Sequence, residues 1–146
     1  MTQTIPAVTF AFRQGDEAPP GGGCPIGGEF VFKTSNDLFA NKRVILFSLP
    51  GAFTPTCSTY QLPGFETQFN DFRAQGIDAI YCISVNDSFV MNEWARALNI
   101  KNVLVIPDGA GAFTQGMGMT VDMSVIGFGN RSRRYAAIID NGTIEH

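Results

Sequence analysis

Histidine is almost absent from this chain of 146 residues: His146, the last residue, is the only one. A Cys–His or Ser–His catalytic pair in the body of the fold is therefore excluded, and so is a metal site built from several histidines. If the chain carries a reactive nucleophile, a group other than imidazole must activate it.

Charge and long apolar runs are also scarce. Charged residues make up 16% of the chain and hydrophobic residues 45%, which is typical of a globular protein. The net charge of −3 gives no indication of nucleic acid or an anionic membrane as a partner. No apolar run approaches the roughly 20 residues of a membrane-spanning helix, and residues 1–6 lack the pattern of a signal peptide. We therefore expect one domain, residues 1–146, in the cytoplasm.

The three cysteines are Cys24, Cys57 and Cys82, an odd number without a motif spacing. This argues against a disulfide scaffold and favours a reducing compartment. No Cys-x-x-Cys motif is present, because Thr54 lies three residues before Cys57 and Tyr60 three residues after it. A thiol–disulfide oxidoreductase is therefore a poor interpretation.

Predicted strands alternate with predicted helices, which indicates an α/β fold with helices on the faces of a sheet. Asn141-Gly142 is a strong signal for a tight β-hairpin, and the chain stops soon after it, so we expect either a short protein or a missing C-terminal segment. We expect strands at 8–12, 29–33, 44–49, 77–85, 103–106 and 135–139, and helices at 35–39, 55–76 with an interruption near Pro63, 88–98 with Ser88 as N-cap, and 112–117.

Cys57 is predicted to lie in the first turn of a helix. Thr54 is a good N-cap and Pro55 suits the first helical position, directly after a buried strand. Unpaired N–H groups and the helix dipole favour a thiolate there. Lowering a thiol pKa from about 8.5 to about 6 raises the thiolate population roughly 30-fold at neutral pH. The alternative is that Cys57 is a small packed residue.

The pattern Pro50-x-x-x-Thr54-x-x-Cys57 resembles the active-site motif of the peroxiredoxins. The longer run 48–58 is similar to the peroxiredoxin-5-like branch, which includes the bacterial glutaredoxin-linked enzymes. Further matches follow the same pattern at 62–65, 84–91, 93–94, 122–124 and 127–135.

The resemblance implies a thioredoxin-like fold with a central mixed sheet flanked by helices. It also implies a thiol peroxidase that reduces hydrogen peroxide and alkyl hydroperoxides and needs no metal, flavin or haem. By position, Cys57 matches the peroxidatic cysteine and Thr54 the threonine that holds the peroxide. Pro50 matches the proline that shields the pocket, and Arg134 the arginine that pairs with the thiolate and the peroxide oxygens. A homodimer is expected, and an exposed Phe53 would suit its interface.

With no histidine available, an arginine can be the group that activates the nucleophile. A guanidinium stays charged and offers a rigid fork of donors, so Arg134 can stabilise both the thiolate and the leaving oxygen. Two further arginines of the same basic run, Arg131 and Arg133, are expected to be solvated.

The resolving partner is left open by the sequence. Cys82 lies in a predicted strand and is expected to be packed and inert, whereas Cys24 lies in a loop rich in glycine. The default is a one-cysteine cycle, for which the resemblance implies glutathione with glutaredoxin as reductant. Thioredoxin as reductant, Cys24 as resolving cysteine, and a redox sensor built on Cys57 are the alternatives.

Overall fold

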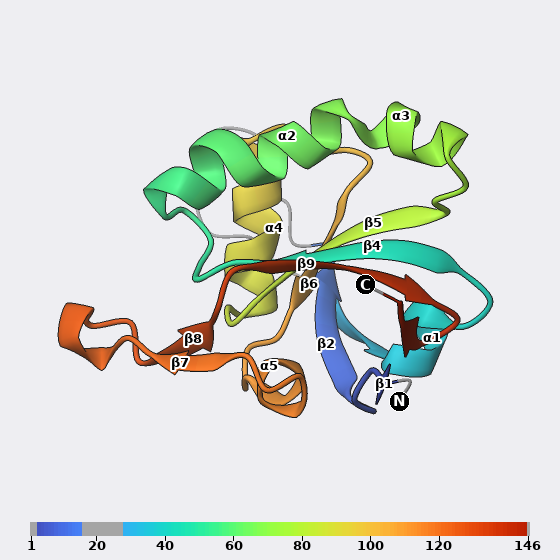
Figure 1. Ribbon diagram of the computed structural model, residues 1–146. Helices are drawn as coiled ribbons and strands as arrows, with labels where there is room; N and C mark the ends of the chain where they lie inside the picture. The colour runs from blue at the N-terminus through green and yellow to red at the C-terminus, as the bar shows by residue number, and fades with distance from the viewer. Residues whose placement is uncertain (1–2, 16–27, 146) are drawn as a thin grey trace.

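The computed structural model describes residues 3–15 and 28–145, and at Cys57 and Thr59 only the backbone (Figure 1). Residues 16–27 of the predicted glycine-rich loop, including Cys24, lie outside the described residues, as does His146.

A mixed sheet forms the centre of the molecule, as predicted. β4, β5 and β6 run parallel to one another, while β9 pairs antiparallel with β4. Crossover connections between the parallel strands carry helices, which is why the sequence alternates between the two kinds of element. In spatial order the strands are β1 (Gln3–Thr4), β10 (Thr143–Ile144), β9 (Tyr135–Asp140), β4 (Arg43–Ser48), β5 (Ala79–Ser84) and β6 (Leu104–Pro107).

The central strand β4 is buried on both faces, as its continuous apolar run predicts. Ile45 and Phe47 point into one hydrophobic cluster, and Val44 and Leu46 point into the other. The first cluster packs under the helices α2 (Leu62–Thr67), α3 (Phe69–Ala74) and α4 (Ser88–Ala97). The second packs under the hairpin β2 (Thr9–Gln14) and β3 (Glu29–Thr34), with α1 (Ser35–Phe39) and α5 (Ala112–Gly116).

The helical segment after Cys57 is predicted correctly in extent, but the position of its break is wrong. It begins as a π-helix, η1 (Cys57–Gln61), and continues as α2 and α3. Pro63 lies directly after the change from the π-helix η1 to α2, and the helical run continues past it. The break falls instead at Gln68, between α2 and α3.

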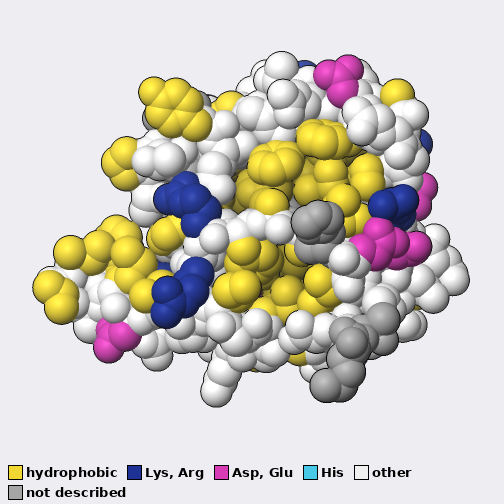
Figure 2. Space-filling view, viewed as in Figure 1, with side chains coloured by type: hydrophobic (Ala, Val, Ile, Leu, Met, Phe, Trp, Pro, Cys, Tyr) yellow, Lys and Arg dark blue, Asp and Glu magenta, His cyan; other side chains and the backbone are white. Residues whose placement is uncertain are grey.

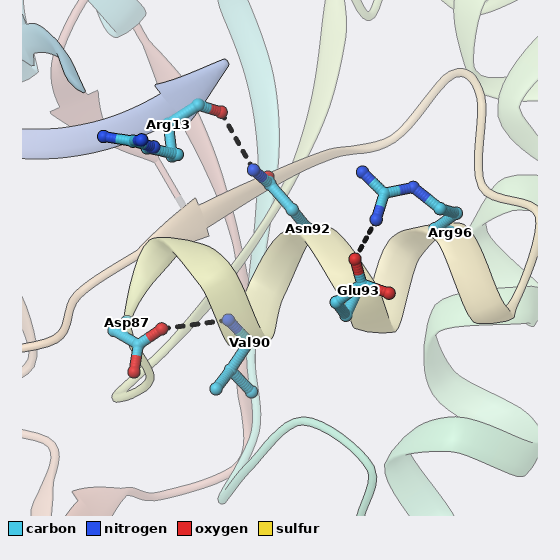
Figure 3. Close-up of polar contacts among 6 residues, drawn as sticks. All are labelled: Arg13, Asp87, Val90, Asn92, Glu93 and Arg96. Atoms are coloured by element: carbon cyan, nitrogen blue, oxygen red, sulfur yellow. Dashed lines mark hydrogen bonds and ion pairs between the residues drawn. The ribbon is translucent and has the colours of Figure 1, made fainter. Parts of the chain in front are cut away.

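The start of α4 also differs from the prediction. Asp87, not Ser88, is the N-cap, and its carboxylate accepts a hydrogen bond of 2.9 Å from the backbone N–H of Val90 (Figure 3). Asn92, farther along α4, donates from its side chain to the carbonyl of Arg13 at 2.8 Å. α4 is thereby capped at one end and tied to β2 along its side.

Two hairpins complete the described chain. Asn141 and Gly142 both have positive φ, 49° and 82°, as the predicted two-residue turn between β9 and β10 requires. The second hairpin, β7 (Thr120–Asp122) and β8 (Asn130–Ser132) with the 3-10 turn η2 (Ser124–Ile126) between them, projects from the body and was not predicted (Figure 1). Its strands of three residues are too short to show an alternating pattern.

The helical layer does not cover β9. Ala136 is exposed and Ile138 half-buried on the face of β9 that belongs to the first cluster. Figure 2 shows hydrophobic side chains gathered in the hollow between α2–α3 and β9, to which Phe65 and Phe72 contribute. No helix in the described part of the chain is long and apolar enough to cross a membrane.

Candidate active site

Cys57 opens the first helical turn after β4. The backbone N–H of Ser58 donates to the carbonyl of Thr54 at 3.0 Å, so Thr54 occupies the N-cap position and Pro55 the first helical position. The backbone thus places Cys57 in the first turn, as predicted. Unpaired N–H groups in such a turn favour the charged form of a nucleophile.

The hydroxyl of Thr54 donates to the carbonyl oxygen of Gly51 at 2.7 Å. Its single proton is therefore engaged, and the hydroxyl oxygen is left as an acceptor. Toward a ligand at the Cys57 turn, Thr54 can receive a hydrogen bond from a hydroxyl or hydroperoxyl group.

The turn that precedes the helix contains a strained residue. The backbone N–H of Thr54 lies 3.4 Å from the carbonyl of Gly51, which closes a four-residue turn. Phe53, at its third position, has φ of 64° and is 54% exposed. Positive φ at this position is the type II pattern, for which glycine or asparagine is usual. Strained residues of this kind are found preferentially at functional sites.

Asn86 holds this turn against the neighbouring parallel strand. Its side-chain oxygen accepts a hydrogen bond of 3.0 Å from the backbone N–H of Ala52 and one of 2.6 Å from the hydroxyl of Ser84, the last residue of β5. The sequence pattern at 84–91 marked this segment, but no role was predicted for Asn86. Its role becomes visible only when β4 and β5 lie side by side.

Arg131 is only partly solvated, which corrects the prediction for this residue. Its half-buried guanidinium donates to the carbonyl of Pro50 at 3.2 Å and to that of Phe128 at 3.0 Å. A Cβ atom at Gly51 would lie 2.6 Å from the Nη1 atom of Arg131, so a side chain there would displace the guanidinium from its present position. Arg131 therefore supports the loop that leads to Cys57 from the β8 side. Arg133, by contrast, is exposed, as predicted.

Arg134 lies directly before β9 and is exposed. Its Nη1 donates a hydrogen bond to the side-chain oxygen of Gln61. Gln61 ends the π-helix that Cys57 begins. The structure thus links Arg134 to the last residue of the π-helix that begins at Cys57, through a contact that the sequence did not reveal.

A buried tryptophan anchors the same turn from α4. Trp94 is fully buried, and its indole N–H donates to the hydroxyl of Ser58 at 2.9 Å. A buried indole N–H needs such a partner. Because Ser58 follows Cys57 directly, this bond fixes the orientation of the turn relative to the core.

A buried polar cluster joins the end of β4 to the segment around Arg134. The hydroxyls of Ser48 and Ser132 lie 2.8 Å apart, and Ser132 donates to the carbonyl of Arg133 at 2.7 Å. Burial raises the pKa of Tyr135, and the negative charge of Asp108 adds to this shift. The phenol therefore stays neutral beside the site and adds no charge to it.

Cys82 is fully buried in β5 within the first hydrophobic cluster, which confirms the prediction that it is packed. Among the described residues, no group of three or more His, Cys, Asp or Glu side chains is arranged to hold a metal ion.

Comparison with known proteins identifies the family. The Redoxin family model matches residues 13–146. A peroxiredoxin from Rhizobium etli is 54% identical over 99% of this chain and 79% of its own length, and one from Synechocystis sp. is 47% identical over 98% and 74%. Among solved structures, reduced Prx3 in complex with H2O2 from Vibrio vulnificus is 39% identical with a TM-score of 0.86, covering 99% of this chain and 81% of that one.

Peroxiredoxin 5 from Alvinella pompejana is 30% identical with a TM-score of 0.80, covering 99% of this chain and 85% of that one. The chain therefore belongs to the peroxiredoxins, thiol peroxidases with a thioredoxin-like fold. Within that family it belongs to the peroxiredoxin-5-like branch.

Proposed function

We propose that Cys57 is the peroxidatic cysteine of this peroxiredoxin and that it reduces hydrogen peroxide and small alkyl hydroperoxides. The observation that carries the proposal is the position of Cys57 in the first turn of η1, between two groups suited to peroxide. The acceptor oxygen of Thr54 lies at the N-terminal end of this turn, and the guanidinium of Arg134 reaches its last residue.

The reaction balances with these groups and one proton taken from water. The thiolate of Cys57 attacks the hydroxyl oxygen of the peroxide, so that an S–O bond forms while the O–O bond breaks. The hydroperoxyl proton is held by the Thr54 oxygen before attack, and Arg134 stabilises negative charge on the departing oxygen. That oxygen takes up a proton and leaves as water or alcohol, and Cys57 becomes a sulfenic acid.

The loop before Cys57 has a supporting role in this proposal. Pro50 shields the site from water, and its carbonyl is held by Arg131. Asn86 fixes the following turn through Ala52. Because the loop is held from both sides, the attacking thiolate of Cys57 and the acceptor oxygen of Thr54 keep a fixed relative position. Such positioning accelerates enzymatic reactions.

We also propose glutathione with glutaredoxin as the reductant. Cys82, the second cysteine within the described part of the chain, is buried in the core and cannot approach a sulfenic acid. An outside thiol is then needed: glutathione displaces water from the sulfenic acid to give a mixed disulfide, which glutaredoxin reduces. If thioredoxin or Cys24 is found to resolve the sulfenic acid instead of glutathione, that reductant replaces this proposal.

A homodimer is proposed from exposed apolar residues close to the site. Phe53 is 54% exposed on the loop before Cys57, and Val125 and Ile126 are exposed at the tip of the β7–β8 hairpin. Exposed large apolar groups of this kind favour protein–protein contact. Sedimentation of the wild type and of Val125→Asp tests the proposal: a wild-type dimer that the variant weakens supports it, and a wild-type monomer contradicts it.

Peroxide consumption by Cys57→Ser is the primary test. With glutathione and glutaredoxin supplied, the variant is expected to lose turnover completely, while Cys82→Ala keeps it. Turnover retained by Cys57→Ser would overturn the assignment. Mass spectrometry of the peroxide-treated wild type, with and without glutathione, follows the second step. A glutathione adduct on Cys57 supports the one-cysteine cycle, a Cys24–Cys57 disulfide contradicts it, and oxidation without repeated turnover indicates a sensor.

A further inference from the structure

A pocket of about 370 Å³ is lined in part by Arg131, whose guanidinium donates to the carbonyl of Pro50 in the loop before Cys57. It is bounded by α5, by the β7–β8 hairpin and by the segments that follow β5 and β6. Ligands in α/β sheets tend to bind at the carboxyl ends of the parallel strands, and this pocket has that location. No step of the peroxide reaction described above uses it.

The one charged group that lines the pocket is the half-buried Arg131. Its Nε and Nη1 atoms donate to the carbonyls of Phe128 and Pro50, which uses two of its five N–H groups. No carboxylate in the described ranges forms an ion pair with it, since the ion pairs there join Arg43 to Glu145 and Arg96 to Glu93. The guanidinium also lies 5.0 Å from the centroid of the Phe128 ring. Its remaining N–H groups can bind an anion, because charge-assisted bonds are the strongest interactions of a guanidinium.

The rest of the lining is polar and uncharged. Gln115 from α5, Thr120 from β7 and Asn130 from β8 surround the opening, and residues 109–111 bring their backbone close to it. Asp108, next to this segment, is buried and accepts hydrogen bonds from Phe113 and Thr114 at the start of α5. Its carboxylate is thus already satisfied within the fold and does not compete for Arg131.

We propose that this pocket binds a small molecule through a carboxylate, with Arg131 as the anchor and the amide and hydroxyl side chains around it as further partners. The planar fork of a guanidinium matches the two oxygens of a carboxylate. The ligand is either a free organic acid or a carboxylate of the tripeptide thiol reductant. The second source, the reductant, rests on the proposed function. A reductant bound to Arg131 would lie one side chain away from the carbonyl of Pro50.

Two probes separate the sources. S-methylglutathione carries the carboxylates of glutathione but no free thiol, so its binding is measured without any redox step, and succinate represents a free organic acid. Titration of the reduced protein, followed by amide chemical shifts, is expected to show saturable changes at 109–111, 120 and 130 with at least one probe. Changes with S-methylglutathione alone indicate the tripeptide, and changes with succinate indicate the organic acid.

The variants decide whether Arg131 is the anchor. Arg131→Gln is expected to weaken binding at least tenfold, and Arg131→Lys to retain part of it. Arg133→Gln removes the same charge from an exposed position two residues away and should leave binding unchanged. Gln115→Glu puts a negative charge at the pocket without touching the bonds of Arg131, and a fivefold or greater loss is expected.

The site is contradicted if neither probe shifts the pocket amides. It is equally contradicted if Arg133→Gln weakens binding as much as Arg131→Gln does, since a general surface charge would then explain the result. The binding measurement does not depend on Cys57. Absence of binding therefore says nothing against Cys57 as the peroxidatic cysteine. Likewise, loss of the Cys57 assignment leaves the binding test valid.

Discussion

The guanidinium of Arg134 donates a hydrogen bond to the side-chain carbonyl of Gln61. The two residues are 73 positions apart in the chain, and Gln61 ends the helical turn that begins at Cys57. An exposed arginine has many rotamers, so an acceptor that holds it at the turn reduces the entropy that it must lose when peroxide binds. Gln61 is therefore a positioning residue for the proposed reaction.

Replacement of this acceptor is expected to lower the efficiency of peroxide reduction. Gln61→Leu should reduce kcat/KM for hydrogen peroxide about tenfold, whereas Arg134→Gln should reduce it roughly 10²–10³-fold, the usual effect of removing one donor from a developing anion. Gln61→Glu keeps the acceptor and should stay close to the wild type. The pH profile of kcat/KM distinguishes a positioning role of Gln61 from a general structural effect. A Gln61→Leu variant with unchanged kcat/KM would contradict the positioning role.

The hydroxyl of Thr54 is expected to be essential. Thr54→Val keeps the shape of the side chain but removes both the acceptor and the bond to Gly51, so kcat/KM should fall about 10²–10³-fold. Thr54→Ser keeps the hydroxyl and should lie within about tenfold of the wild type. Circular dichroism checks that both variants fold, and full activity in Thr54→Val would argue against the proposed contact with peroxide.

Asn86 is expected to stabilise the fold as well as the site. Asn86→Ala leaves the N–H of Ala52 and the hydroxyl of Ser84 without their acceptor, which should lower the free energy of unfolding by about 1–3 kcal/mol. Asn86→Asp retains an oxygen at the same place and serves as the matched control. Urea denaturation measures both, and an Asn86→Ala variant as stable as the wild type would contradict the prediction.

Glu66 makes stability depend on pH. Partial burial alone would raise its pKa, but hydrogen bonds from the backbone N–H groups of Val103, Asn102 and Lys101 outweigh this and lower the pKa below the ordinary value of 4.5. A carboxylate with a depressed pKa stabilises the folded state above its unfolded-state pKa, and the contribution is lost as the pH falls through the folded value.

Glu66→Gln is therefore expected to be less stable than the wild type by about 1–2 kcal/mol at pH 7, because neutral acceptors make weaker bonds than charged ones. The difference in stability between the two proteins should narrow as the pH falls below the ordinary value of 4.5 and through the lower folded-state pKa. Thermal denaturation of both proteins from pH 7 to pH 3 measures it. A difference that stays constant over this range would show that the charge of Glu66 is not the cause.

Features that depend on neighbouring residues were predicted from the sequence. The continuous apolar run 44–49 predicted the central strand, and Asn141-Gly142 predicted the turn after β9. Thr54 and Pro55 placed Cys57 in a first helical turn. Even the local signals have limits: Pro63 was read as an interruption, although the helical run continues past it, and Asp87 caps α4 in place of Ser88.

The sequence by itself singled out Cys57 as the proposed nucleophile and predicted the local structure around it, because caps, turns and strand patterns act over a few residues. Only the tertiary structure decided which polar groups surround that turn. Arg131 reaches Pro50 across 81 positions, and Asn86 reaches Ala52 across 34, because β4 lies beside both β5 and β9. Contacts of this range follow from the order of the strands in the sheet, which no local pattern in the sequence encodes.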